Sequence, residues 1–362
     1  MRPPARPQAV FRLPAAAGAR ETPRSQLKNM QPILKVQNLQ VHFPHREGVV
    51  RAVNDVSFTL RRGGTLGVVG ESGSGKSMTA LAVLRLIQPP GRIAGGEIWY
   101  ARDGSQGGET ASNLLAASRR SMRQIRGAEI AMIFQEPMTA LNPVLTIGEQ
   151  IREGIEVHED LSRREADNRT VEIMKAVAIP SAEQRMKEYP HQLSGGLRQR
   201  AMIAMALAPR PKLLIADEPT TALDVTIQAQ ILDLLVRLKE EFHLSLLMIS
   251  HDLGVIAQIA DEVAVMYAGK IVEFAPAREI FSNPLHPYTE GLLKSIPRWA
   301  ASRKAARRLE SIPGAVPDPR RLPLGCAFQP RCKDDRGDAC GRAPISLTTL
   351  ETNRQVRCVK YV

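Results

Sequence analysis

The stretch GESGSGKS at Gly70–Ser77 decides the fold, because it matches the phosphate-loop pattern G-x-x-x-x-G-K-[ST] at every fixed position. A short apolar run, Thr65–Val69, precedes it, and a helical pattern, Lys76–Ile87, follows it. This strand–loop–helix order is the setting that a phosphate-binding loop requires. Glycines let the backbone approach phosphates with its N–H groups turned inward, and the start of the helix adds positive potential. The sequence therefore predicts a nucleotide site.

The side chains of this loop suit ATP and Mg²⁺. Lys76 can reach the β- and γ-phosphates, and Ser77 can supply a hydroxyl to the metal ion. We expect the whole loop and the residue after it to bind the nucleotide, namely Gly70, Glu71, Ser72, Gly73, Ser74, Gly75, Lys76, Ser77 and Met78.

A second apolar strand, Leu213–Asp217, ends in an acid that Glu218 follows. Asp217 fits the Mg²⁺ site, and Glu218 fits the residue that orients or deprotonates an attacking water. Short apolar strands that end in Asp are common, so this pair alone could be an ordinary exposed one. Together with the phosphate loop, it favours a hydrolytic site.

The segment LSGGLRQR at Leu193–Arg200 resembles the signature that distinguishes ATP-binding-cassette (ABC) ATPases from other phosphate-loop proteins. Further marks of that family occur in the expected order. Gln135 follows the strand pattern IAMIF, as the family's Q-loop glutamine does, and Ala222–Asp224 resembles the D-loop. His251 follows LSLLMIS, as the switch histidine does, and Phe43 lies where the family often has an aromatic that stacks on adenine. The chain is thus identified as a member of the ABC ATPases.

This resemblance implies a site shared by two subunits. The turn formed by Ser194, Gly195 and Gly196 of one subunit would close over the γ-phosphate held by the other, with Asp224 near the nucleotide. ATP then joins a dimer that hydrolysis releases. The residues agree with this, because Ser194 suits a helix N-cap and the glycines leave the helix start bare as an anion site.

The resemblance also assigns individual roles. It places catalysis on Glu218, His251 and Gln135, and Mg²⁺ ligation on Ser77, Gln135 and Asp217. Plainer interpretations stay open for some of these residues. Phe43 could pack into the core from its strand. His251 could cap a helix or lie at the surface, and Gln135 gains its role from its register alone.

The predicted fold class is α/β, a phosphate-loop ABC ATPase core with an antiparallel β portion, a helical subdomain and a small Cys-rich C-terminal module. We expect an ABC nucleotide-binding domain over 30–280, with the helical subdomain at about 136–195. Residues 281–362 form a C-terminal extension. The basic, Pro/Ala-rich residues 1–29 are predicted to be a disordered arm, unless translation begins at Met30. Other strands are expected at 33–42, 49–60, 93–101, 128–134, 244–250 and 263–267, and other helices at 196–208, 226–242 and 252–260.

Three segments resemble ATPase subunits of the oligopeptide/dipeptide (and nickel) importers. They are EPMTALNPVLTIGEQI at Glu136–Ile151, NPLHPYTEGLLKSIP at Asn283–Pro297 and IPGAVPDPRRLPLGCAFQPRC at Ile312–Cys332. This resemblance implies that the chain is peripheral to the cytoplasmic face of the cell (inner) membrane. Its implied partners are a second ABC ATPase subunit, two transmembrane permease subunits and an extracytoplasmic peptide-binding protein. The cargo would be di- or oligopeptides, with nickel or glutathione as alternatives.

After Gln135, ATPases of this family grip a helix of the membrane subunit. Met138, Leu141, Val144 and Leu145 are apolar candidates for that grip, and core packing is the alternative. The resemblance leaves open whether the ATPase partner is a second copy of this chain or a related one.

A soluble DNA-repair or translation ABC ATPase is the rival interpretation, because the chain carries a formal charge of +12. Residues 1–29 account for part of that charge, with six basic residues against Glu21. Such proteins generally carry two cassettes, whereas this chain has a single GxxxxGKS and a single LSGG. Aromatic residues make up 4% of the chain, which offers little stacking surface for single strands. We expect no nucleic-acid partner.

The four cysteines, Cys326, Cys332, Cys340 and Cys358, all lie in the last 37 residues, a clustering with a chance probability on the order of 10⁻⁴. Cytosolic thiols stay reduced, so a set of four suits an iron–sulfur cluster or zinc rather than disulfides. The spacing C-x₅-C-x₇-C-x₁₇-C lacks the C-x₂-C pairs of common zinc modules, which favours iron–sulfur. Peptide-importer subunits have a similar pattern, which implies a [4Fe–4S] cluster; the absence of any metal is the other alternative.

Overall fold

The structure, a computed structural model, describes residues 31–103, 109–136, 140–221, 223–295, 311–351 and 353–362. Several predictions from the sequence lie outside these residues. They concern the arm at 1–29, the start at Met30, the grip residue Met138 and Ala222 of the D-loop motif.

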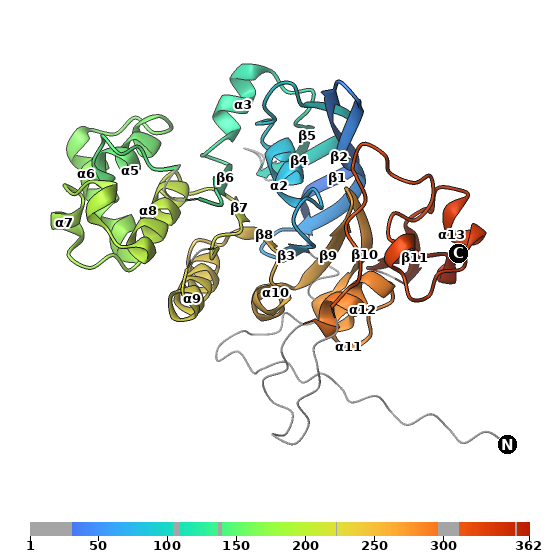
Figure 1. The fold of residues 1–362 in the computed structure, drawn as a ribbon. Helices are drawn as coiled ribbons and strands as arrows, with labels where there is room; N and C mark the ends of the chain where they lie inside the picture. The colour runs from blue at the N-terminus through green and yellow to red at the C-terminus, as the bar shows by residue number, and fades with distance from the viewer. Residues whose placement is uncertain (1–30, 104–108, 137–139, 222, 296–310, 352) are drawn as a thin grey trace, which may run out of the picture.

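An eight-stranded sheet of order β11-β12-β10-β9-β3-β8-β7-β6 forms the centre of the molecule (Figure 1). Neighbours from β6 to β9 pair in parallel. These strands are buried throughout, as expected for a parallel sheet covered on both faces. Their bounds are Thr65–Val69 for β3, Ile130–Ile133 for β6, Leu213–Asp217 for β7, Ser245–Ser250 for β8 and Glu262–Tyr267 for β9. Because parallel strands end at one edge, the phosphate loop after β3 and the acids after β7 lie at the same edge.

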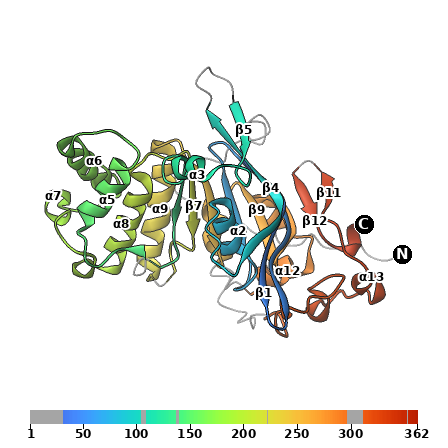
Figure 2. The ribbon, with the colours of Figure 1, turned by 90° about the horizontal axis from the view of Figure 1, so that it is seen from above.

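A second, antiparallel sheet has the order β2-β1-β4-β5 (Figure 2). Its strands are Pro32–His45 (β1), Gly48–Arg61 (β2), Arg92–Asp103 (β4) and Glu109–Asn113 (β5). A hydrophobic core joins it to one face of the central sheet and to helix α2, Lys76–Val83. The opposite face of the central sheet belongs to another core, so Leu213 and Leu214 of β7 point into different cores.

Helix α2 is shorter than the sequence predicts. It ends at Val83, whereas the pattern extends to Ile87. Leu84 caps the helix and Arg85 has a φ of 53°, which the helix cannot continue through. The Arg85 guanidinium then donates to the carbonyl oxygens of Leu114 and Ala117, which ties this turn to the segment after β5.

Helices α5 to α8 form a group to one side of the sheet in Figures 1 and 2. Their bounds are Ile147–Glu156, Arg163–Ala176, Ala182–Arg185 and Gly195–Leu207, with a short 3-10 turn at Pro190–Gln192. Capping boxes begin α5 (Thr146 with Glu149) and α6 (Ser162 with Glu165). Helix α8, which begins at the end of the predicted 136–195 subdomain, packs against α5 and α6 and so belongs to this group.

The remaining helices cover the sheet or follow it. They are α3 at Arg119–Ile125, α9 at Val225–Glu241, α10 at Leu253–Ile259, α11 at Ala277–Ser282, α12 at Pro287–Lys294 and α13 at Asp338–Gly341. Within the described part of the chain, none of the helices combines the length and apolar content that crossing a bilayer requires.

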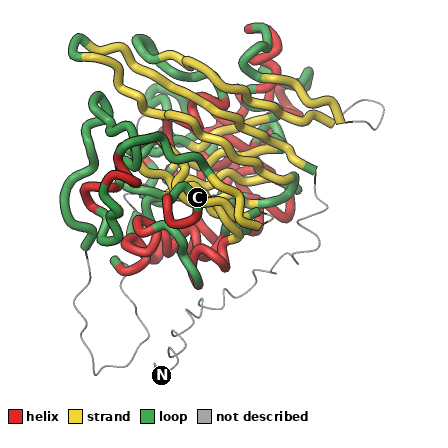
Figure 3. Tube along the Cα trace, turned by 90° about the vertical axis from the view of Figure 1, so that its right-hand side faces the viewer, coloured by secondary structure: helices red, strands yellow, loops and turns green. Residues whose placement is uncertain are grey.

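The C-terminal extension continues the central sheet. Strand β12, Arg354–Val356, pairs with β10, Lys270–Pro276, and carries β11, Thr348–Glu351, at the edge. Two 3-10 turns, η2 at Gln329–Arg331 and η3 at Val359–Tyr361, complete it. In Figure 3, which views the molecule from this side, the C-terminus lies in front of the strands.

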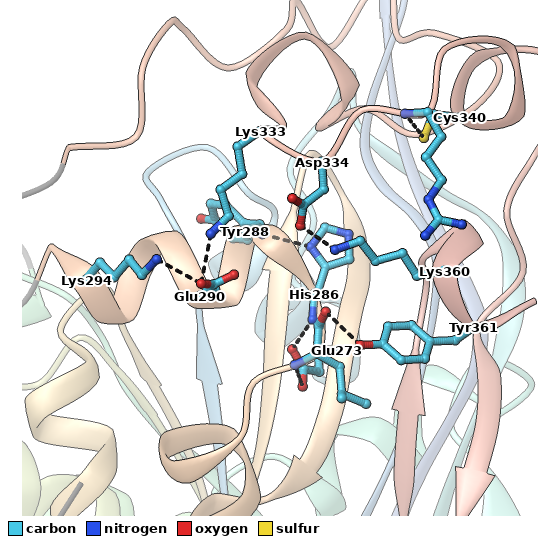
Figure 4. Close-up of polar contacts among 12 residues, drawn as sticks. Glu273, His286, Tyr288, Glu290, Lys294, Lys333, Asp334, Cys340, Lys360 and Tyr361 are labelled. Atoms are coloured by element: carbon cyan, nitrogen blue, oxygen red, sulfur yellow. Dashed lines mark hydrogen bonds and ion pairs between the residues drawn. The ribbon is translucent and has the colours of Figure 1, made fainter. Parts of the chain in front are cut away.

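Polar contacts fasten the extension (Figure 4). The buried carboxylate of Glu273 on β10 accepts hydrogen bonds from the backbone N–H groups of Leu285 (2.8 Å) and His286 (2.9 Å). Within the extension, Glu290 on α12 pairs with Lys333 at 2.8 Å, so the anchor to the core is the Glu273 carboxylate. The extension is therefore anchored to the last strands of the ATPase core.

Candidate nucleotide site

The phosphate loop follows β3 and needs glycine at two positions for steric reasons. A Cβ on Gly70 would lie 2.2 Å from the carbonyl oxygen of Met266. Gly75 has a φ of +100°, and a Cβ there would lie 2.3 Å from the carbonyl oxygen of Ala52. The loop is thus packed tightly between β9 and β2, which fixes its N–H groups before a ligand arrives.

Lys76 lies folded over the inside of the loop. Its Nζ donates to the carbonyl oxygens of Gly70 (2.8 Å) and Glu71 (3.1 Å), and the side chain is buried. Burial lowers the pKa of Lys76. The ammonium is held where it can turn from loop carbonyls to phosphate oxygens.

Ser77 and Asp217, the two predicted Mg²⁺ ligands from different motifs, lie next to each other. Ser77 Oγ donates to Asp217 Oδ1 at 3.0 Å. Burial raises the pKa of Asp217 to about 6, against the opposing hydrogen bond from Ser77. Hydroxyl and carboxylate oxygens are the donors that Mg²⁺ prefers, so this pair fits the metal ion of a Mg–ATP complex.

Glu218 is the point on which the predicted catalytic residues converge. Its Oε2 accepts hydrogen bonds from Gln135 Nε2 (3.1 Å) and Thr221 Oγ1 (3.0 Å), and His251 Nδ1 lies 3.0 Å away. Sequence reasoning missed Thr221, although it follows Glu218 closely in the chain. Two strand ends, after β6 and β8, and the turn at Thr221 therefore place polar groups at the carboxylate that follows β7.

The backbone at Glu218 is unusual, because its φ is 47°. Left-handed backbone in a residue other than glycine is costly and occurs preferentially at functional sites. The N–H of Glu218 donates to the carbonyl oxygen of Ile249 (2.9 Å), and its own carbonyl accepts from the N–H of Thr221 (3.1 Å). These two bonds hold the left-handed backbone of Glu218 in place.

Phe43 is half-buried and packs against the core beneath the antiparallel sheet. It pairs with Val50 on β2, two residues before Ala52, whose carbonyl oxygen lies against Gly75. The ring also lies close to Gly91, where an added Cβ would be 2.4 Å from it. Phe43 therefore lies on the strand pair that contacts the phosphate loop through Ala52, and it is in partial contact with the core.

The signature turn starts α8 in the way the sequence predicts. Ser194 caps the helix by accepting from the N–H of Leu197 (3.4 Å), and Ser194 and Gly195 are exposed. Asp224 caps α9 in the same way, accepting from the N–H of Ile227 (2.9 Å). Figures 1 and 2 both show α8 apart from α2, the helix that follows the phosphate loop. The turn is thus accessible from outside the chain.

The apolar residues after Gln135 divide into two groups. Leu141 is buried in the core, whereas Val144 is 76% exposed. Phe134, at the end of β6, is also exposed. Leu145 is half-buried. Core packing thus accounts for Leu141, whereas Phe134 and Val144 are exposed apolar side chains.

The four cysteines gather around one small pocket in the extension, which all of them line. Their thiols are free of disulfides. Burial raises the pKa of Cys326 to about 11 and also raises those of Cys332 and Cys358. Among the described residues, no His, Cys, Asp or Glu side chains form a group of three or more arranged to hold a metal ion.

Comparisons with known proteins agree with this geometry. A family model described as "ABC transporter" matches residues 53–221, and one described as "Oligopeptide/dipeptide transporter, C-terminal region" matches residues 272–340. The chain belongs to the ABC transporter family and is an ATPase of that family.

Among its relatives is a Brucella ovis protein named "Putative peptide import ATP-binding protein BOV_A0348". The two are 50% identical over 335 residues, which span 91% of this chain and 98% of the relative. A Brucella abortus protein with the same description is 51% identical over 327 residues, spanning 90% and 94%.

Solved structures show the same fold. The dimeric ATP-binding cassette MJ0796, in a post-hydrolysis state bound to ADP and Pi, has a TM-score of 0.58 and 25% identity. The match covers 67% of this chain and 98% of the cassette. CbiO1 from Clostridium perfringens, part of an ABC transporter complex, has a TM-score of 0.57 at 25% identity and covers 70% and 91%. The predicted ABC ATPase fold with its antiparallel β portion is confirmed.

Proposed function

We propose that the chain is the ATP-hydrolysing motor subunit of an ABC importer that takes up di- or oligopeptides. The observation that carries the hydrolytic part is the convergence of Gln135, Thr221 and His251 on Glu218. The peptide-import names of its relatives and the match to the oligopeptide/dipeptide C-terminal region support the cargo class.

The chemistry follows from the residues present. Lys76 and the loop N–H groups bind the phosphates, while Ser77, Asp217 and Gln135 would hold Mg²⁺, which neutralises charge on the β- and γ-phosphates. Glu218 orients or deprotonates a water that attacks the γ-phosphorus in line; the bond to the ADP oxygen breaks, and ADP and phosphate leave. His251, whose Nδ1 lies 3.0 Å from the Glu218 carboxylate, would contact the γ-phosphate.

Phosphate release by the purified chain tests this directly. Lys76→Ala should abolish ATP binding and turnover, because no other side chain of the loop carries a positive charge. Lys212→Ala, at an exposed lysine just before β7, is the matched control and should behave like the wild type. Turnover that survives Lys76→Ala would contradict the proposal.

We further propose that the site is completed by a second ABC ATPase subunit. The exposure of Ser194 and Gly195 supports this, because the capped start of α8 is a ready anion site that the chain's own phosphate loop does not need. In this arrangement Ser194, Gly195, Gly196 and Asp224 approach the triphosphate held by the partner. Ser194→Arg should block hydrolysis while ATP binding by the single chain persists. Retained hydrolysis in that variant would contradict a shared site.

The transport partners follow from the same proposal. Two transmembrane permease subunits and an extracytoplasmic peptide-binding protein would complete the importer at the cytoplasmic face of the cell membrane. Phe134 and Val144, which lie before and after Gln135 in the chain, are exposed apolar side chains of the kind that suits contact with a permease helix. Uptake of labelled peptides, nickel and glutathione by vesicles carrying the whole complex distinguishes the cargoes. Uptake of nickel or glutathione without peptide would contradict the peptide assignment.

The domain organisation belongs to this proposal as well. The nucleotide-binding domain spans residues 30–280, with its helical subdomain at about 136–195, and residues 281–362 form the importer-type extension with its cysteine module. We also propose that Phe43 stacks on adenine and that Met78 lines the nucleotide site.

For the cysteine module we propose a [4Fe–4S] cluster held by Cys326, Cys332, Cys340 and Cys358. The four cysteines line one pocket, and four thiolates are the ligand set of such a cluster. Because the described side chains do not form a ready metal-binding group, binding would require the thiols to move closer together. Iron and acid-labile sulfide in anaerobically purified protein, lost in a Cys340→Ser variant, would be the expected result. Colourless protein loaded with zinc would contradict it.

A further inference from the structure

The C-terminal extension reaches into the phosphate loop through one side chain. Arg331, on turn η2, donates from Nη1 to Glu71 Oε2 (2.9 Å) and from Nη2 to Glu71 Oε1 (3.1 Å). Two parallel bonds between a guanidinium and a carboxylate are the most specific ion-pair geometry available to a protein. The Arg331 side chain is 6% exposed, so solvent screens the pair only weakly. The pair joins residues 260 positions apart.

The guanidinium is held on its other sides too. Arg331 Nε donates to the carbonyl oxygen of Pro313 (2.9 Å), and Nη1 also donates to the hydroxyl of Tyr267 (3.2 Å). Its carbon atom Cζ lies 5.7 Å from the ring centre of Tyr267 and 5.9 Å from that of Phe328. Arg331 therefore has a fixed position, from which it can hold a flexible partner.

The extension also contacts the backbone of Glu71. The N–H of Glu71 donates to the hydroxyl of the buried Tyr288 on α12 at 2.9 Å. The Tyr288 ring packs against Tyr267 and Phe328, with ring centres 4.6 and 5.3 Å away. Both the main chain and the side chain of Glu71 are thus held by residues outside the phosphate loop.

Glu71 in turn contacts the lysine that binds phosphate, since its carbonyl oxygen accepts from Lys76 Nζ. A carboxylate at this position would repel a nucleotide triphosphate if it were unpaired and free to turn toward the loop. We propose that Arg331 is a positioning residue for ATP binding: it neutralises the Glu71 carboxylate and holds it aside, so that nucleotide affinity depends on the C-terminal extension. This inference rests on the ATP-binding part of the proposed function and is independent of the cargo.

The experiment compares nucleotide affinity in the full-length chain and three variants, Arg331→Met, Glu71→Gln and the double variant. Titration with a fluorescent ATP analogue gives Kd, and phosphate release gives KM and kcat separately. Arg331→Met should weaken Kd and raise KM about tenfold, the size of a modest coupling free energy, with kcat nearly unchanged. The double variant should recover most of the affinity, because the repelling charge is gone.

The dependence of ATP affinity on salt distinguishes electrostatic repulsion by Glu71 from a merely structural role of Arg331. Raising the ionic strength should narrow the difference between Arg331→Met and the wild type, because salt screens the repulsion. Arg342→Met is the matched control: Arg342 lies in the same extension, is exposed, and pairs with Asp338 at the start of α13. It should leave Kd unchanged.

Each outcome is decisive. Three results would each overturn the inference. The first is wild-type ATP affinity in a folded Arg331→Met variant, and the second is an ATP affinity of the double variant as low as that of Arg331→Met. The third is a loss of ATP affinity in Arg331→Met that does not depend on ionic strength. If Arg331→Met does not fold, Arg331→Lys takes its place; this variant keeps the charge but loses one of the parallel bonds, and it should weaken Kd by a smaller factor that Glu71→Gln again relieves. A wild-type chain that binds no ATP would instead overturn the proposed function itself.

Discussion

Replacing Glu273 with alanine should release the attachment of the C-terminal extension. This carboxylate on β10 is fully buried and accepts the N–H groups of Leu285 and His286, at the start of the segment that carries Tyr288 to the phosphate loop. The buried N–H of His286 and the part-buried N–H of Leu285 would each lose their acceptor, at a cost of about 1–3 kcal/mol for each group, so Glu273→Ala should lower the free energy of unfolding by about 2–6 kcal/mol.

Hydrogen exchange followed by mass spectrometry measures the change in this segment, and urea unfolding measures the change in the free energy of unfolding of the whole chain. The peptide that contains Leu285 and His286 should exchange much faster in Glu273→Ala, because the free energy needed to open this segment falls. Glu290→Gln is the matched control, because its carboxylate is part-exposed and pairs with Lys294 and Lys333 at the surface; it should cost less than about 1 kcal/mol. Unchanged exchange in Glu273→Ala, or an equal loss in both variants, would refute the reasoning.

Three further variants test the nucleotide site. Thr221→Val removes one hydrogen bond to a carboxylate and should lower kcat about tenfold, from the ~1.5 kcal/mol of such a bond, with KM unchanged; steady-state phosphate release measures both, and an unaltered kcat would remove Thr221 from the site. Asp217→Asn should raise the Mg²⁺ concentration needed for half-maximal turnover by about tenfold or more, whereas Asp233→Asn on α9 should not; equal Mg²⁺ curves would argue against Asp217 as a ligand. Gly75→Ala should weaken ATP binding by about tenfold or more, because its Cβ would meet the carbonyl oxygen of Ala52 at 2.3 Å; the control Gly95→Ala meets nothing nearer than 3.7 Å, and wild-type affinity in Gly75→Ala would show that the loop tolerates the shift.

The sequence is most informative where a short motif imposes its own geometry. The phosphate loop requires a strand before it and a helix after it, and the structure has β3 and α2 in those positions. The buried parallel strands are equally predictable from the sequence, because short continuous apolar runs are typical of strands covered on both faces. The N-caps at Ser194 and Asp224 follow from local chemistry alone.

Contacts between distant segments are what the sequence does not reveal. Nothing in the run around Arg331 indicates that its guanidinium reaches Glu71, because a salt bridge leaves no periodic pattern in either segment. The same holds for Tyr288, which the motif analysis leaves unassigned although its hydroxyl meets the phosphate loop. The early end of α2 is also not predicted from the sequence, because it accompanies hydrogen bonds from Arg85 to carbonyl groups of a distant segment after β5.

The catalytic assignment of Glu218 is tested most directly by ATP turnover in a Glu218→Gln variant, measured beside its ATP affinity. The amide keeps the shape of the side chain but cannot take a proton from water. We predict that turnover falls by about 10²-fold or more while the Kd for ATP stays within the wild-type range. Near-normal turnover in this variant would contradict the account of the site.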